Sequence, residues 1–273
     1  MLRPLLLTAA VLALAGSATS AYTFDQEGTV AAPRAASHDG QPLDDDFRIE
    51  GHAATTTSST IDRAGVSARP GERADSGAAV ARNQAGLALR RKAGEHVDVG
   101  LEVDGAWGPP RTTRDGAPVD APDEPVLDVA LAVRASTPLG DGGSFRIGWA
   151  INAGAHQAPI RRDAGSTRRD AAFLFRAAMV PSLRRGVVTL FGSFGVATET
   201  DVPASVFVSD RQDDPGVVHD TVGVALTVAA GAAVELGSGA RVTARVGDAL
   251  SRRIDAGHYG PQVDVGLAFD LGK

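Results

Sequence analysis

The sequence contains no cysteine, and this absence excludes two arrangements. Disulfide bonds cannot stabilise the chain, so its stability must come from backbone pairing and burial. A lipid anchor on a processed cysteine is excluded as well. Lysine is also scarce, at Lys92 and Lys273 only, and the formal net charge of −6 is mild. Nothing in this charge balance indicates a nucleic-acid partner.

Long hydrophobic runs are missing after the N-terminal region. The longest apolar stretch, residues 222–234, is interrupted by Thr227 and several glycines. A membrane-spanning helix needs about 18 or more consecutive apolar residues, so a helical span is excluded there. If the chain crosses a membrane, it must do so as a closed β-barrel, because lipid offers no other partner for unpaired backbone groups.

The N-terminus has the layout of a secretory signal peptide. Arg3 precedes an apolar run over residues 5–16, and small residues fill positions 17–21. The apolar run is too short to remain as a membrane anchor. We therefore expect a signal peptide over residues 1–21, with cleavage after Ser20 or Ala21. The next segment, residues 22–45, is rich in Ala, Pro, Gly, Asp and Gln without periodicity, which predicts a disordered periplasmic tail.

From residue 77 onward, apolar and small or polar residues alternate with a period of two. In the clearest segment Val222, Val224 and Leu226 share one face, opposite small residues such as Ala225. Successive side chains of a strand leave opposite faces of a sheet, so such alternation predicts β-strands. Nine segments follow this pattern: 79–90, 97–103, 127–134, 145–156, 171–180, 187–197, 222–236, 241–248 and 263–271.

The connections between these segments alternate in length. Short links lie near residues 93–94, 138–143, 182–186 and 237–239, and long polar links span 108–125, 157–170, 198–220 and 249–262. Outer-membrane barrels are connected in this way, with tight periplasmic turns and long external loops. A barrel with both termini in the periplasm needs an even number of strands. Residues 46–53 supply the tenth strand, which makes 55–76 the first outer loop.

The second face of the strands carries mainly Gly, Ala and Thr with scattered charges. A soluble barrel would cover that face with Lys, Glu and Asn, whereas a narrow lumen needs small residues. The sequence therefore predicts an all-β fold, an up-and-down antiparallel transmembrane β-barrel of ten strands, with eight as the alternative, over residues 46–273.

By this topology and alternation, residues 46–273 resemble the small bacterial outer-membrane β-barrel proteins. The resemblance implies a monomer in the outer membrane of a Gram-negative cell, with outer-membrane lipid and the barrel assembly machinery as partners. Members of this class typically end on a strand whose last residue is aromatic. Here Phe269 lies inside the last segment and the chain closes with Leu271, Gly272 and Lys273. Aromatic residues, which form girdles in such barrels, are also few.

The strand pattern places a set of polar residues on the lumen side. They either line a polar path or pair with one another and plug the barrel. We favour plugging, because barrels of eight to ten strands have little free bore and mixed charges in low dielectric pair. The expected barrel-interior polar residues are Arg48, Glu50, Asp98, Glu102, Asp104, Asp128, Arg134, Arg146, Asn152, Arg176, Arg245, Asp264 and Asp270.

No constellation in the sequence predicts a catalytic, cofactor or metal site. None of the six histidines, His38, His52, His96, His156, His219 and His258, stands at metal-ligand spacing. The Gly-x-Ser-x-Gly motif of serine hydrolases is missing. The strand count resembles that of omptin-like proteases, but the acidic pairs of that family are not reproduced.

Paired arginines in the predicted outer loops are candidate contacts for lipopolysaccharide phosphates, which guanidinium groups bind bidentately. They are Arg161, Arg162, Arg168, Arg169, Arg252 and Arg253. The sequence thus predicts a non-catalytic outer-membrane barrel with a structural, adhesive or small-solute passage role. Two alternatives stay open: an outer-membrane hydrolase (a protease or lipid hydrolase) with a rim-loop active site, and a soluble secreted β-sandwich or barrel that binds a ligand.

Overall fold

The computed structural model describes the barrel, the segment that precedes it and parts of the connections. The described residues are 19–22, 29–30, 33–36, 38–56, 60–64, 75–80, 83–107, 111–114, 117–120, 125–140, 142–161, 167–199, 218–221, 223–237, 239–251 and 258–271. Most of the predicted signal peptide, residues 1–18, lies outside this set, and so do Arg162, Arg252 and Arg253.

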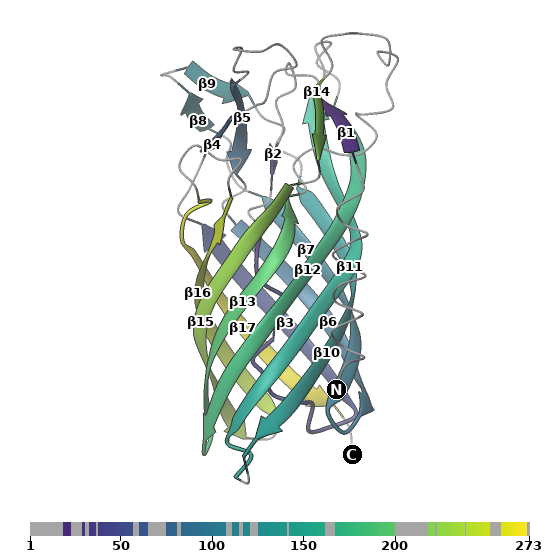
Figure 1. Ribbon diagram of the computed structural model, residues 1–273, viewed down its shortest axis with the longest axis vertical. Coiled ribbons are helices and arrows are strands. Elements are labelled where there is room, and N and C mark those ends of the chain that lie inside the picture. The colour runs from purple at the N-terminus through teal and green to yellow at the C-terminus, as the bar shows by residue number, and fades with distance from the viewer. Residues whose placement is uncertain are drawn as a thin grey trace.

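Ten antiparallel strands form a closed barrel, as predicted (Figure 1). They are β3 (Phe47–Thr56), β6 (Asn83–Gly94), β7 (Val97–Trp107), β10 (Val126–Leu139), β11 (Phe145–Arg161), β12 (Thr167–Arg185), β13 (Val188–Glu199), β15 (Gly223–Gly237), β16 (Ala240–Leu250) and β17 (Gln262–Leu271). Each strand pairs with its neighbour in this order, which is the up-and-down topology. The last strand closes on the first, from Leu271 opposite Phe47 to Gln262 opposite Thr56.

Several strands are longer than the sequence predicts: β10 continues to Leu139 and β12 to Arg185. Two further differences change a predicted loop and the start of a predicted strand. The ladder between β11 and β12 continues to Arg161 opposite Thr167, so the loop expected over 157–170 is much shorter. At the first predicted downward strand, the barrel strand begins only at Asn83. Ala79 and Val80 belong instead to β5 (Asp75–Val80). Residues 167–170 are all polar and show no alternation, so the pattern does not predict that β12 begins there. At residues 79–90 the alternation instead continues across the point where the chain enters the barrel ladder.

Small sheets lie beyond one end of the barrel (Figure 1). They join β1 (Thr19–Tyr22) with β14 (Val218–Thr221), β5 with β4 (Thr60–Ala64) and β2 (Thr29–Val30), and β8 (Arg111–Arg114) with β9 (Ala117–Asp120). Most of these strands come from the predicted long connections. We call this end the loop end, and the opposite end, where Gly186 and Val187 form a two-residue turn, the turn end.

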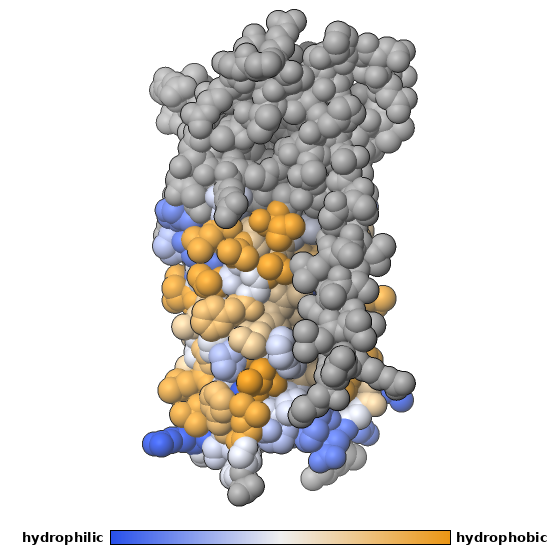
Figure 2. Space-filling view, viewed as in Figure 1, coloured by the Kyte–Doolittle hydropathy of each residue, from blue (hydrophilic) through white to orange (hydrophobic). Residues whose placement is uncertain are grey.

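The outer wall of the barrel is apolar. Leu101 is 46% exposed, Leu131 69% and Val133 49%, while their strand neighbours Glu102, Ala132 and Arg134 are buried. Figure 2 shows hydrophobic residues gathered over the wall and hydrophilic ones at the turn end. The apolar face therefore points outward, as expected for strands that contact lipid. No helix in the described residues is long and apolar enough to cross a membrane.

Candidate functional site

The lumen is occupied by the chain segment that precedes β3. Described residues of this lumen segment, 33–36 and 38–46, lie between Gln262, whose Nε2 donates to the Pro33 carbonyl (3.1 Å), and Lys92, whose backbone N–H donates to the Asp46 carbonyl (2.9 Å). Gln262 stands at the loop end of β17, and Lys92 lies near the turn end of β6. The segment therefore runs along the barrel interior from one end toward the other.

This placement differs from the disordered periplasmic tail predicted for residues 22–45. The described part of that range is enclosed: Ala36 is 1% exposed and His38 7%. Low hydrophobicity predicts disorder when a segment has nothing to pack against. Here the barrel wall supplies complementary partners that the local sequence does not reveal.

One side of the lumen wall is small and nearly neutral. Ala36 packs in an apolar cluster there with residues of four strands, Ala150, Ala178, Val180, Phe191 and Ala233. A Cβ on Gly148 would stand 2.7 Å from both Gly40 Cα and His38 Nε2, both atoms of the lumen segment. Gly40 itself has φ of +79°, a conformation that favours glycine. The close approach of segment and wall therefore depends on glycine on both sides.

The opposite side of the wall is charged and binds the segment through ion pairs. Arg34 Nη2 lies 2.5 Å from Asp104 Oδ2, and Arg241 Nη1 lies 2.5 Å from Asp39 Oδ2. Side chains also bind the segment's carbonyls: Ser136 Oγ donates to the Gly40 carbonyl (2.6 Å). Opposite charges at two heights therefore hold the segment in one direction and one register.

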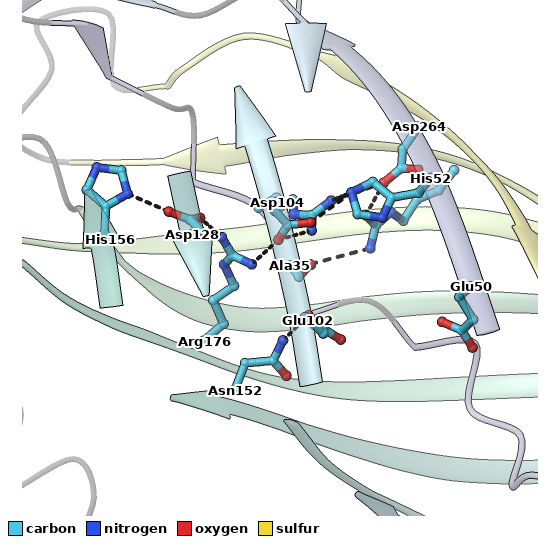
Figure 3. A network of polar contacts seen from close by, with 12 residues as sticks. Ala35, Glu50, His52, Glu102, Asp104, Asp128, Asn152, His156, Arg176 and Asp264 are labelled. Atoms are coloured by element: carbon cyan, nitrogen blue, oxygen red, sulfur yellow. Dashed lines mark hydrogen bonds and ion pairs between the residues drawn. The ribbon is translucent and has the colours of Figure 1, made fainter. Parts of the chain in front are cut away.

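A polar network surrounds Arg34, which bonds His52 and Asp104. Figure 3 shows these two residues with Arg176 and Asp128 of the same network. His52, Gly86, Asp104, Asp128 and His156 are successive cross-strand partners on β3, β6, β7, β10 and β11. Gly86 leaves the space that the side chains of Asp104 and His52 fill, because a Cβ there would stand 1.9 Å from Asp104 Oδ1. The row thus forms one continuous band of polar side chains around half of the wall.

Arg176 of β12 connects this band. Its Nη1 donates to Asp104 Oδ2 (3.2 Å) and its Nη2 donates to Asp128, which also bonds His156 Nδ1 (2.6 Å). Arg34 donates to His52 as well, and Arg245 pairs with Asp264 (Figure 3). Each carboxylate in the network therefore faces at least one cation, as buried charges require.

A second set of ion pairs lies one row nearer the turn end. Arg134 Nη2 donates to Glu102 Oε1 (2.6 Å), and Asn152 Nδ2 donates to Glu102 Oε2 (2.5 Å). Arg90 Nη2 lies 2.5 Å from Glu50 Oε2. Arg48 pairs with Asp270 across the strands that close the barrel. These contacts cross-link adjacent and next-but-one strands on the lumen side and leave little room for solute.

The structure places all of the predicted interior polar residues on the lumen side and brings most of them into these networks. Arg146 lies near the turn end, where its Nε donates to Ser136 Oγ (2.8 Å). Sequence analysis missed the partners Arg34 and Asp39, on the assumed tail, and Arg90 and Arg241, at the ends of weak strand patterns. Both arginines lie inside the predicted segments 79–90 and 241–248, on the same face as Ala88 and Arg245, so the alternation within these segments would have found them.

The structure says less about the arginines predicted to contact lipopolysaccharide. Arg161, Arg168 and Arg169 stand at the loop-end tips of β11 and β12, and their side chains are not described. The lipopolysaccharide contacts therefore stay a prediction. Within the described part of the chain, no group of three or more His, Asp or Glu side chains is arranged to hold a metal ion. At the loop end His258 Nδ1 lies 3.2 Å from Asp248 Oδ2.

The space left in the lumen is small. A cavity of about 60 Å³ lies between the lumen segment and the charged wall, beside His38, Arg48 and His52. A second cavity, of about 20 Å³, lies beside Pro33, Arg34 and Gln262. Such volumes hold a few water molecules. In this state the lumen segment occupies the space through which a solute would pass.

Comparisons with known proteins bear on the fold. No protein-family model and no curated protein matches the chain. Among solved structures, the chain is similar to the translocator domain of the autotransporter NalP from Neisseria meningitidis, with 13% identity over 83% of this chain and 88% of that chain and a TM-score of 0.42. It is also similar to an outer membrane channel from Pseudomonas putida F1, with 9% identity over 86% and 99% and a TM-score of 0.44.

A third similar structure is the outer membrane protease OmpT from Escherichia coli, with 12% identity over 83% of this chain and 97% of that chain and a TM-score of 0.41. Identities this low concern the fold alone. The evidence for the class of barrel comes from this chain itself: it has a closed ten-stranded topology, an apolar outer wall and a polar lumen. The architecture is that of an outer-membrane β-barrel.

Proposed function

We propose that this protein is a non-catalytic outer-membrane barrel with a structural or adhesive role, closed to solutes by its own lumen segment. It is exported by its signal peptide, stands as a monomer in outer-membrane lipid, and is placed there by the barrel assembly machinery. The observation that carries the proposal is the filling of the lumen by the described residues 33–36 and 38–46, beside which lie cavities of about 60 and 20 Å³. With the lumen closed, the surface at the loop end is the part of the protein that would carry an adhesive role.

Two features of the lumen support closure over conduction. The segment has ion pairs on the charged wall through Arg34 and Asp39, and apolar packing on the neutral wall through Ala36. The segment is therefore held against both sides of the lumen. Removing the segment would leave Asp104 and Arg241 of the wall without their partners Arg34 and Asp39, which costs free energy.

Single-channel recording in planar bilayers tests the closure. We expect no conductance steps from the wild-type barrel and steps from Gly148→Ala, because the added Cβ overlaps Gly40 and His38 and displaces the segment. Deletion of residues 33–43 should give larger steps. Gly51→Ala is the matched control, since its Cβ would make an ordinary contact of 3.6 Å with Leu87 Cδ2. Steady conductance of the wild type, equal to that of the deletion, would reject a closed barrel.

Small-solute passage is the second candidate, and one observation favours it. Side chains of the wall bind the carbonyls of Pro33, Ala35 and Gly40, and the described part of this segment does not join the backbone ladder of the barrel. Such contacts separate one by one, so a displaced segment would leave an intact polar channel. Wild-type conductance that appears only in bursts, with Gly148→Ala prolonging the bursts, would favour passage over a permanently closed barrel.

A further inference from the structure

The lumen segment enters the barrel from the loop end. Arg34 pairs with Asp104 and lies 4.0 Å from Asp264, both in the loop-end halves of their strands. The Pro33 carbonyl bonds Gln262, the first residue of β17. The other limit of the segment, Asp46, is joined to Lys92 at the turn end, where β3 begins. The chain thus descends through the lumen before it turns back into the first strand of the wall.

The chain before Pro33 continues on the loop-end side. β2 (Thr29–Val30) pairs in parallel with Ala79 and Val80 of β5, in the small sheet beyond the barrel (Figure 1). The last barrel strand, β17, ends at the turn end, opposite Phe47. The two ends of the barrel domain therefore leave it on opposite sides, although its even number of strands would return both to one side.

The reach of the segment is sufficient for this path. Residues 33–46, fully extended at about 3.3–3.6 Å per residue, span at most roughly 45–50 Å. The hydrocarbon core of a bilayer is about 30 Å thick. Direction is set by charge: Arg34 meets Asp104 and Asp264 near the loop end, and Asp39 meets Arg241 nearer the turn end. A reversed segment would place like charges together.

We propose that the barrel carries its own mature N-terminal chain to the cell surface, where β2 pairs with β5 in the small sheet at the loop end. This placement goes beyond a closed barrel, because it assigns the mature N-terminus to the outside of the cell rather than to the periplasm.

Labelling with a membrane-impermeant maleimide tests the proposal, since the chain has no cysteine and gives no background. Three single variants are compared on intact and permeabilised cells: Gln26→Cys before the lumen segment, Ser209→Cys in the long connection after β13, and Ser144→Cys in the turn between β10 and β11. We expect Gln26→Cys and Ser209→Cys to react on intact cells, and Ser144→Cys only after permeabilisation. Heat-dependent gel mobility verifies that each variant forms a barrel.

A second pair of variants shows whether the lumen segment delivers the N-terminus. In the Gln26→Cys background, Arg34→Glu places a like charge beside Asp104 and should lower surface labelling several-fold while the barrel still shifts on heating. Arg34→Lys keeps the cation and should label normally. If Gln26→Cys reacts only after permeabilisation while Ser209→Cys reacts on intact cells, the N-terminus is periplasmic and the proposal fails. Reaction of Ser144→Cys instead of Ser209→Cys on intact cells also overturns it.

These outcomes are separate from those of the conductance test. Surface labelling of Gln26→Cys together with steady wild-type conductance would reject the closed barrel and keep the external N-terminus. Labelling of Gln26→Cys only after permeabilisation, together with absence of wild-type conductance, would reject the external N-terminus and support the closed barrel.

Discussion

At the scale of single residues, the interior depends on charges that are buried and shared. Asp104 accepts from Arg34 and Arg176 and lies 3.2 Å from His52 Nε2. Buried ions are expensive to leave without a partner, whereas exposed pairs are screened by water. The cost of losing a carboxylate should therefore depend on its depth in the lumen.

Asp104→Ala tests this dependence on depth. The substitution leaves two buried guanidinium groups short of a partner, so we expect the free energy of unfolding to fall by about 3–5 kcal/mol. The matched control is Glu235→Ala at the turn end, where the pair with Arg184 (2.8 Å) is about a third exposed and its loss should cost at most about 1 kcal/mol. Urea unfolding in detergent micelles measures both values. Equal losses for the two variants would contradict the prediction.

At the scale of elements, the two ends of the barrel differ in how they connect the strands: tight turns lie at the turn end and long connections at the loop end. At the turn end, Arg185 pairs with Val188 across Gly186 and Val187, and Gly186 has φ of +59°. A turn this tight determines the register of β12 against β13. The long connections at the loop end close at an entropic cost that grows slowly with length.

Inserted residues should therefore be tolerated at one end only. Four residues placed after Gly186 should greatly reduce the heat-modifiable fraction of the protein. The same four residues placed after Ser209, in the connection between β13 and β14, should leave that fraction close to the wild-type value. The band ratio of unheated to heated samples on a gel is the measurement. Equal sensitivity at both sites would show that the turns do not determine the register.

At the scale of the whole molecule, the barrel is inverted relative to a soluble protein. Leucines and valines such as Leu131 face outward, and the charged residues face the lumen. Only an apolar surrounding makes such an outer surface favourable, because apolar area left in water costs free energy. The outer wall is thus the surface that lipid covers, and the lumen is the polar core.

A charge on the outer wall should prevent insertion. Leu131 lies near the middle of β10, between Leu101 and Ala153 on the neighbouring strands. Leu131→Arg should cost about 2–4 kcal/mol at the bilayer midplane and deplete the protein from the outer-membrane fraction. Ala132→Ser, one residue further and facing the lumen, is the control and should fractionate normally. If Leu131→Arg inserts as well as this control, the outer wall does not contact lipid.

The sequence by itself was enough for the wall of the barrel. Alternation such as that of residues 222–236 is local, since each residue's face follows from its neighbours along one strand. The ten strands and the lumen side of residues such as Arg48 and Asn152 were therefore predictable. The start of β6 was not, because the pattern continues past the point where the backbone changes its pairing partner. The start of β12 was not either, because residues 167–170 are all polar and show no alternation.

Only the tertiary structure decided what fills the barrel. The lumen segment has no periodicity, and its place depends on partners far away in the chain, such as Asp104 for Arg34 and Arg241 for Asp39. Closure of β17 on β3 creates the enclosed wall on which these partners converge. Complementarity of charge and shape across that space is a property of the closed barrel, and no stretch of the sequence carries it alone.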